Sequence, residues 1–380
     1  MIEFALSAAD FRGRYFEREP WLMRGALRER PVDWPALDEL LYRIEPTPAG
    51  MQLFNRGAIP AEAYTHELVE LGQRRRRLNK IGFYSHMRGG ATLVINRLET
   101  QASFARRLCT EIGRFAGAPS SGNAYLSFSG DGTFGRHWDT HDVFAIQLIG
   151  RKRWQVFAPT LPLPLSHQTS ERSDQPCPVT PVLDCTLEAG DVLYVPRGWW
   201  HQVIPLQEGS FHFSVGTYPP TTQDYVGWVC SRVLAATIDG RRSLANATPD
   251  GLQSVMRQLA SAVVDPQVQA EYQQWIGAQE TLAAPFDIGL FLDQRLPMLQ
   301  ETSRLAANVR AVPDVQGRLS INGVLTPLDP AAIAVLRALA QGPLDFATLA
   351  QRLRELPKES VHRAVLDLIG REVVIALPDV

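Results

Sequence analysis

Long hydrophobic runs are missing from this chain. No stretch approaches the ~20 consecutive apolar residues that a membrane-spanning helix needs. The first residues, Met1 to Ser7, also lack the basic start and apolar stretch of an export signal. We therefore expect a cytoplasmic protein without a membrane segment.

The chain is also poor in cysteine, and it carries no large excess of one charge. The four cysteines are scattered, with no Cys-x-x-Cys spacing, which argues against a zinc site or a disulfide framework. They are Cys109, Cys177, Cys185 and Cys230. The formal net charge is −2, so nothing global indicates nucleic-acid binding. A hydrophobic content of 45% over 380 residues is sufficient for two or three folded domains.

A candidate metal site stands out among the residues that are present. His137 and Asp139 flank Trp138, and His201 follows the turn Pro196-Arg197-Gly198 much further along the chain. On a strand, residues i and i+2 face the same side, so His137 and Asp139 can bind one ion. Two histidines and one carboxylate form a facial set that suits Fe(II) and leaves positions open. His-x-Asp alone is a weak signal, and the prediction depends on the surrounding pattern.

That pattern is a series of short strands separated by turns. Alternating or apolar, β-rich segments bounded by glycine and proline occur at 123–129, 142–149, 150–157, 187–196 and 211–218. Such a run predicts a small barrel or a double-sheet jelly roll.

The ordered motifs resemble a known family. Four stretches are similar to the JmjC domain of the cupin-4 type. They are Ser127-Phe-Ser, His137-Trp-Asp with the strand that follows to Trp154, Leu187-Glu-Ala-Gly-Asp-Val-Leu-Tyr-Val-Pro, and Phe213-Ser-Val-Gly. Within it, the chain looks like the bacterial ribosomal oxygenases. The resemblance implies an α+β protein with a double-stranded β-helix core. It also implies a protein hydroxylase that uses Fe(II), 2-oxoglutarate and O2.

The resemblance assigns roles to individual residues. His137, Asp139 and His201 match the iron ligands, and Lys152 matches the cation that binds the distal carboxylate of 2-oxoglutarate. The alternation of side chains along a strand supports this role for Lys152, because Lys152 should face inward while Arg151 and Arg153 face outward. A solvated basic turn is the alternative. Ser214 matches a Ser or Thr that helps to hold the same carboxylate, and Asn123 and Tyr125 match polar residues near the cosubstrate and the substrate. For these three, ordinary hydrogen bonding within strands is the alternative.

Two further histidines should share faces with site residues. His141 follows Asp139 by two positions, and His212 precedes Ser214 by two. We expect His141 beside the site in a supporting role; ligation of the metal is the alternative. His212 either lines the cavity or is an ordinary interior histidine.

The chain divides into three predicted parts. Residues 1–218 are the predicted catalytic domain, and Pro219-Pro220 ends its strand pattern. Residues 219–303 read as a helical dimerisation domain by analogy with relatives; a packing domain within one chain is the alternative. Its predicted helices cover 225–238, 248–264, 266–278 and 288–300. Residues 304–380 resemble a winged helix, with a hairpin turn at Asn322-Gly323, but no basic recognition face, so we expect no DNA binding.

The run Arg74 to Arg77 has two interpretations. The simpler one is a solvated basic surface, and the other is a docking patch for an acidic substrate or ribosomal RNA.

The substrate is left open by the sequence. We favour an arginine or histidine side chain of a ribosomal protein, by resemblance. A ribosomally synthesised natural-product peptide is a second possibility, because His141, His212 and Trp199-Trp200 make the expected pocket rim differ from that of the bacterial enzymes that the chain resembles. A non-catalytic cupin that binds metal or peptide is the alternative of another class.

Overall fold

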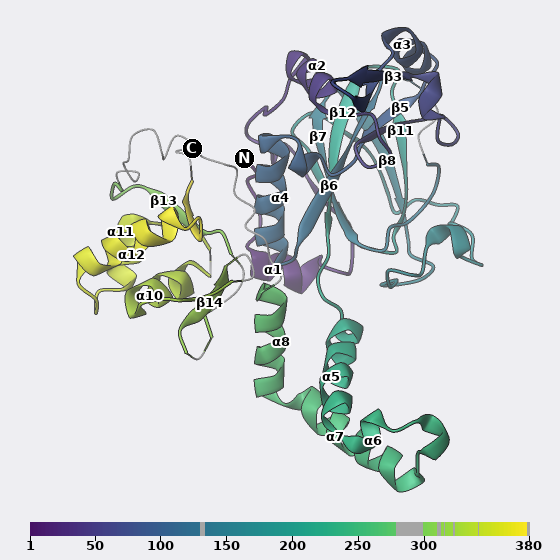
Figure 1. Cartoon of the computed structure of the whole chain (residues 1–380). Helices are drawn as coiled ribbons and strands as arrows, with labels where there is room; N and C mark the ends of the chain where they lie inside the picture. Colours follow the sequence, from purple (N-terminus) through teal and green to yellow (C-terminus); the bar gives the residue numbers. More distant parts are fainter. Residues whose placement is uncertain are drawn as a thin grey trace. The chain divides into compact units, whose positions relative to one another are not determined.

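The computed structural model describes residues 1–129, 134–278, 299–309, 313–314, 316–321, 324–340 and 342–377. The chain forms two compact units, Met1–Tyr218 and Pro219–Val380 (Figure 1). The proposed further division between residues 303 and 304 stays a prediction.

The first unit combines helices with two antiparallel sheets. Its helices are α1 (Ala8–Arg14), α2 (Trp34–Arg43), α3 (Lys80–Arg88) and α4 (Ser103–Ala116). Its strands are β1 (Trp21–Met23), β2 (Met51–Phe54), β3 (Thr65–Glu70), β4 (Gln73–Leu78), β5 (Thr92–Ile95), β6 (Ser120–Ser127), β7 (Asp142–Ile149), β8 (Lys152–Phe157), β9 (Leu183–Leu187), β10 (Val192–Val195), β11 (Trp200–Pro205) and β12 (Ser210–Thr217).

The larger sheet has the order β1-β10-β7-β12-β6-β5-β2, and the smaller one has the order β11-β8-β9. Strands β3 and β4 form a separate hairpin. The predicted α+β architecture with a double-sheet jelly-roll core is confirmed.

The two faces of the larger sheet differ in character. On β12, Phe211, Phe213 and Val215 are fully buried in the main hydrophobic core. That core includes Leu108 and Ile112 of α4, whose helix contacts β6 and β12 (Figure 1). The alternate residues His212, Ser214 and Gly216 line a cavity together with residues of β8 and β11. Period-two alternation therefore separates a helix-covered face from a polar inner face.

A glycine turn joins the two sheets next to the site. Gly150, between β7 and β8, has φ +64°, a conformation that favours glycine. A Cβ there would also collide with the carbonyl of Gly209. The turn thus lets β8 begin at Lys152 with this side chain facing inward.

The second unit begins with helices α5 (Thr222–Ala236), α6 (Ile238–Arg241), α7 (Pro249–Val264) and α8 (Pro266–Ala278). Thr221 and Asp224 form a capping box at the start of α5. Thr248 caps α7, with Pro249 at the first helical position, as their sequence spacing indicates.

The remainder comprises β13 (Arg304–Ala307), β14 (Arg318–Ile321), β15 (Val324–Pro327), α10 (Pro330–Leu339), β16 (Leu344–Asp345), α11 (Phe346–Arg352), α12 (Lys358–Gly370) and β17 (Val374–Ala376). It has a hydrophobic core of its own, centred on residues such as Val335, Leu349 and Leu368. The expected hairpin is present as β14 and β15. The descriptions of these parts as a dimerisation domain and a winged helix stay predictions.

Some predicted features lie outside the described residues. They are the turn at Asn322-Gly323 and nearly all of the helix expected at 288–300. Within the described part of the chain, every helix is too short or too polar to cross a membrane.

Candidate metal and cosubstrate site

Backbone pairing brings the two separated parts of the metal motif together. His137 N–H donates to the carbonyl of His201 at 3.1 Å, and His201 N–H donates to the carbonyl of His137 at 2.7 Å. Gly198 N–H donates to the carbonyl of Asp139 at 3.0 Å. We expected a strand around His137, but the structure has only this single β-bridge there. The motif therefore lies in a loop that pairs with the start of β11.

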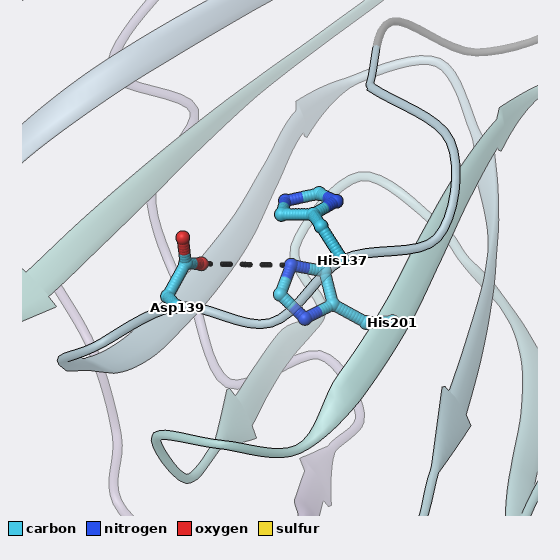
Figure 2. A group of neighbouring side chains, drawn as sticks. All are labelled: His137, Asp139 and His201. Carbon is cyan, nitrogen blue, oxygen red and sulfur yellow. Dashed lines mark ion pairs between the residues drawn. The ribbon is translucent and has the colours of Figure 1, made fainter. Parts of the chain in front are cut away.

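The three side chains converge on one point. Ligand atoms of His137, Asp139 and His201 all lie within 4.8 Å of one another, and Figure 2 shows the side chains directed toward a common space. Asp139 Oδ2 is 3.6 Å from His201 Nε2. Trp138 points the other way and is buried against Phe157 and Trp200. Alternation therefore places the ligands on one side and the hydrophobic anchor on the other.

Backbone carbonyls orient both imidazoles. His137 Nδ1 is 3.2 Å from the carbonyl of Gly135, and His201 Nδ1 is 3.1 Å from that of Trp199. Because a carbonyl only accepts, each Nδ1 carries the proton and each Nε2 presents its lone pair. This is the arrangement expected of metal-binding histidines. The donor set therefore fits a divalent metal such as Fe(II).

The protonation states suit metal binding as well. Burial and the nearby His137 lower the pKa of His201 to about 4, so His201 is neutral at pH 7. Burial opposes ionisation of Asp139, but His201, His141 and His137 outweigh it and lower its pKa. The site thus presents a neutral imidazole and a carboxylate, which are the ligand forms that a metal binds.

A cavity of about 290 Å³ extends from the triad between the two sheets. Its walls combine aromatic side chains with polar groups from β6, β8, β11 and β12. The residues predicted for the site all line it: Asn123, Tyr125, His137, Asp139, Lys152, His201 and Ser214. His141 and His212 line it too. Folding therefore brings together every site residue expected from the sequence, while their individual roles stay predictions.

Lys152 is an unusual buried cation. Its side chain is on the inner face, only 2% exposed, whereas Arg151 and Arg153 face outward and pair with Glu208 and Asp184. Lys152 Nζ lies 3.0 Å from His212 Nδ1 and 3.3 Å from the carbonyl of Tyr125. It forms no ion pair with a carboxylate of the described residues, and burial lowers its pKa to about 7. A buried cation without a counter-ion fits an anionic ligand such as a carboxylate.

The other polar residues differ in how they are engaged. Asn123 Oδ1 accepts the backbone N–H of Arg97 at 3.0 Å. Burial, followed by the charge of Asp139, raises the pKa of Tyr125, which keeps its hydroxyl protonated. His141 stacks on Tyr218 at 4.9 Å between ring centroids and is not among the three clustered ligands. Its position beside the metal site agrees with a supporting role.

Ser127 and Tyr218 are among the cavity residues that were not predicted as site residues. Ser127 is fully buried, and its Oγ has no partner within the described part of the chain. It shares the inner face of β6 with Asn123 and Tyr125, so alternation alone could have identified it. Tyr218 follows β12 and lines the cavity in the folded structure. No local sequence pattern indicates this.

The arginine run lies elsewhere, on the hairpin of β3 and β4. Arg74 and Arg76 pair with Glu67, and Arg77 pairs with Glu70. These ion pairs offset much of the local positive charge and favour the simpler interpretation of a solvated surface.

The fold and the triad together define the class of protein, a double-stranded β-helix with a facial two-histidine, one-carboxylate site. Comparison with known proteins makes this more specific. Residues 94–225 match the JmjC domain family, so the chain contains a JmjC domain, as predicted.

Sequence relatives share this domain. A protein of Dictyostelium discoideum named bifunctional lysine-specific demethylase and histidyl-hydroxylase NO66 is 34% identical over 154 residues, which are 40% of this chain and 30% of that protein. The protein of the same name from Drosophila persimilis is 32% identical over 136 residues, or 36% of this chain and 20% of that protein. The chain thus matches less than a third of these relatives' length.

Solved structures extend the likeness to the whole fold. The Escherichia coli ribosomal oxygenase YcfD superposes with a TM-score of 0.56 over 99% of both chains, at 20% identity. Its complex with cobalt and 2-oxoglutarate gives a TM-score of 0.57 at 19% identity. This likeness shows that the two chains share a fold.

Removal of one ligand should abolish stable metal binding. We expect His137→Ala and His201→Ala each to weaken Mn(II) binding by more than about 100-fold, since even residues that only support metal ligands contribute roughly 10–100-fold. Calorimetric titration of the metal into the metal-free protein measures this. His66→Ala, on the exposed part of β3, is the matched control and should bind like the wild type. Unchanged affinity in both site variants would contradict the triad.

Proposed function

We propose that the protein is an Fe(II)- and 2-oxoglutarate-dependent hydroxylase that modifies a side chain of a ribosomal protein. The observation that carries the proposal is the pairing of a metal-ligand triad with a buried, uncompensated Lys152 in one cavity. Together they provide a metal-binding end and an anion-binding end. A dicarboxylate that chelates a metal requires both.

The residues divide the binding task between them. His137, Asp139 and His201 would hold Fe(II), and Lys152 would pair with the distal carboxylate of 2-oxoglutarate. Ser127, Ser214 and Tyr125 offer hydroxyl groups along the same wall. When bound, iron and cosubstrate supply the oxidation of a C–H bond by O2, with succinate and CO2 as coproducts. This chain's own residues bind, orient and shield the reactants.

Aromatic side chains would limit access of water to the site. Trp154 is buried and stacks on His201 at 5.9 Å between ring centroids. Phe134 lies edge-on to His137 at 5.8 Å and is 47% exposed, so it stands at the rim. A water-poor cavity strengthens the interaction of charged ligands with Lys152 and the triad.

The proposed substrate rests on the relatives. One group is named a histidyl-hydroxylase, and the structural neighbour is named a ribosomal oxygenase. Both names support an arginine or histidine side chain of a ribosomal protein as the target, which would place the reaction in the cytoplasm.

Mass spectrometry of ribosomal proteins tests this function. The protein is reconstituted with Fe(II) and 2-oxoglutarate without oxygen, and then exposed to air with ribosomal proteins. We expect one residue of one protein to gain the mass of one oxygen atom, only when both iron and 2-oxoglutarate are present. His137→Ala is the inactive control. A gain that persists without 2-oxoglutarate, or no gain in any ribosomal protein, would contradict the proposal.

Binding of 2-oxoglutarate should weaken as the pH rises above about 7. The pKa of Lys152 is lowered to about 7, so above that pH the ligand-free protein must take up a proton to bind a carboxylate. The Kd should therefore rise by up to about tenfold per pH unit, a limit set by one linked proton. Below pH 7, Lys152 is already charged and this dependence disappears.

Calorimetry with Mn(II) and 2-oxoglutarate between about pH 6 and pH 9 measures the effect, and Lys152→Arg is the control. Arginine stays protonated throughout that range, so its Kd should lack this component. A wild-type Kd that is constant or falls with pH would contradict the expectation.

The homodimer is also a proposal, supported by an apolar face in the second unit. Helix α7 has no buried residue, and Leu252 and Met256, one helical turn apart, are 48% and 64% exposed. Val264 at its end is 71% exposed. A helix with an uncovered apolar stripe fits association with a second copy.

Introducing charge into this stripe should prevent dimer formation. We expect the double variant Leu252→Glu and Met256→Glu to give the mass of one chain in light scattering coupled to size-exclusion chromatography. The wild type should give twice that mass. Gln253→Glu adds a similar charge at an exposed position of α7 and should leave the dimer intact. A monomeric wild type, or a dimeric double variant, would contradict the proposal.

A further inference from the structure

The Lys152 ammonium is held by groups from two other strands. Its Nζ contacts His212 Nδ1 on β12 at 3.0 Å and the backbone carbonyl of Tyr125 on β6 at 3.3 Å. Both partners are neutral acceptors. Since a lysine ammonium has three N–H donors, at least one remains for a ligand.

His212 is fixed more firmly than a typical pocket side chain. Its ring stacks on Tyr125 with centroids 4.7 Å apart and planes 9° apart. Trp154 meets it edge-on at 5.6 Å and 83°. The residue is 4% exposed and lies within β12, which pairs with β6 and β7 on its two sides. Rotation of the imidazole is therefore restricted by packing on two sides.

The contact also defines the tautomer of His212. When Lys152 is protonated, its ammonium only donates, so Nδ1 is the acceptor and the ring proton is on Nε2. Burial and the charge of Lys152 both lower the pKa of His212, which agrees with a neutral ring. The histidine thus orients the lysine without neutralising it. A carboxylate at this position would instead compete with an anionic ligand for the same charge.

We propose that His212 is a positioning residue that holds the Lys152 ammonium toward the cavity and thereby sets the affinity for the dicarboxylate cosubstrate. The inference rests on the proposed function of the site. Lysine has a long flexible stem, and a fixed neutral acceptor reduces the number of orientations that binding must select. His212 is not one of the three clustered metal-ligand candidates, so its role is distinct from theirs.

Three substitutions separate this role from general packing. His212→Asn keeps a carbonyl oxygen near the position of Nδ1, whereas His212→Gln moves the acceptor one carbon further out. His212→Phe keeps a ring for Tyr125 and Trp154 but removes the acceptor. We expect His212→Phe and His212→Gln to raise the Kd for 2-oxoglutarate about tenfold or more, as for loss of a hydrogen bond to a charged group. The His212→Asn variant should stay close to the wild type.

Calorimetry of 2-oxoglutarate binding to the Mn(II)-loaded protein gives the Kd, and Mn(II) binding without 2-oxoglutarate serves as an internal reference. In succinate formation, His212→Phe and His212→Gln should raise the KM for 2-oxoglutarate and leave kcat at saturation nearly unchanged. His66→Phe, at an exposed position on β3, controls for the loss of a histidine. If His212→Phe does not fold, the contrast between His212→Asn and His212→Gln decides.

The possible outcomes are distinct. A wild-type protein that binds no 2-oxoglutarate would overturn the proposed function, and this inference with it. If the wild-type protein binds 2-oxoglutarate and the His212→Phe, His212→Gln and His212→Asn variants bind it equally well, the inference alone is overturned. A parallel loss of Mn(II) affinity in His212→Phe and His212→Gln would also overturn it, because His212 would then support the barrel rather than Lys152.

Discussion

The pair of backbone hydrogen bonds between His137 and His201 is the constraint on which the site depends. It joins two segments that are far apart in sequence and brings their side chains to one point. Trp138 and Trp200, the neighbours of these ligands, pack edge to face at 6.2 Å behind the bridge. The same peptide segments thus place polar ligands in the cavity and aromatic anchors in a small hydrophobic cluster. Because the anchors are buried, packing restricts the positions of the ligands, which reduces the cost of ordering them.

A second constraint is the distribution of charge along the cavity. Asp139 supplies a negative charge among the three converging ligands, and Lys152 supplies a positive charge without a carboxylate partner in the described part of the chain. Between them the walls are aromatic or carry neutral hydroxyl and amide groups. In the proposed function, a divalent metal would compensate the first end, and the far end of a bound dicarboxylate would compensate the second. The proposed metal and cosubstrate would therefore occupy complementary parts of one cavity.

Much of the inner surface could be predicted because strand alternation is a local property. The inward position of Lys152 between two outward arginines follows directly from it, as does the shared face of Asn123 and Tyr125. The starts of α7 at Thr248-Pro249 and of α10 at Asp329-Pro330 follow from N-cap chemistry. The contact of Lys152 with His212 depends on which strands face each other across the cavity, and no local pattern contains that information. The ion pairs of Arg74 to Arg77 likewise depend on the register of a hairpin.

The most direct test of the account is a measurement of succinate formed from 2-oxoglutarate in the presence of the candidate ribosomal substrate. The account predicts succinate in proportion to hydroxylated product, only with Fe(II) and O2, and none above background for His137→Ala. Equal succinate formation by wild type and His137→Ala would contradict the assignment of the triad. The absence of succinate from a wild-type protein that binds both metal and 2-oxoglutarate would contradict the proposal that the site is catalytic.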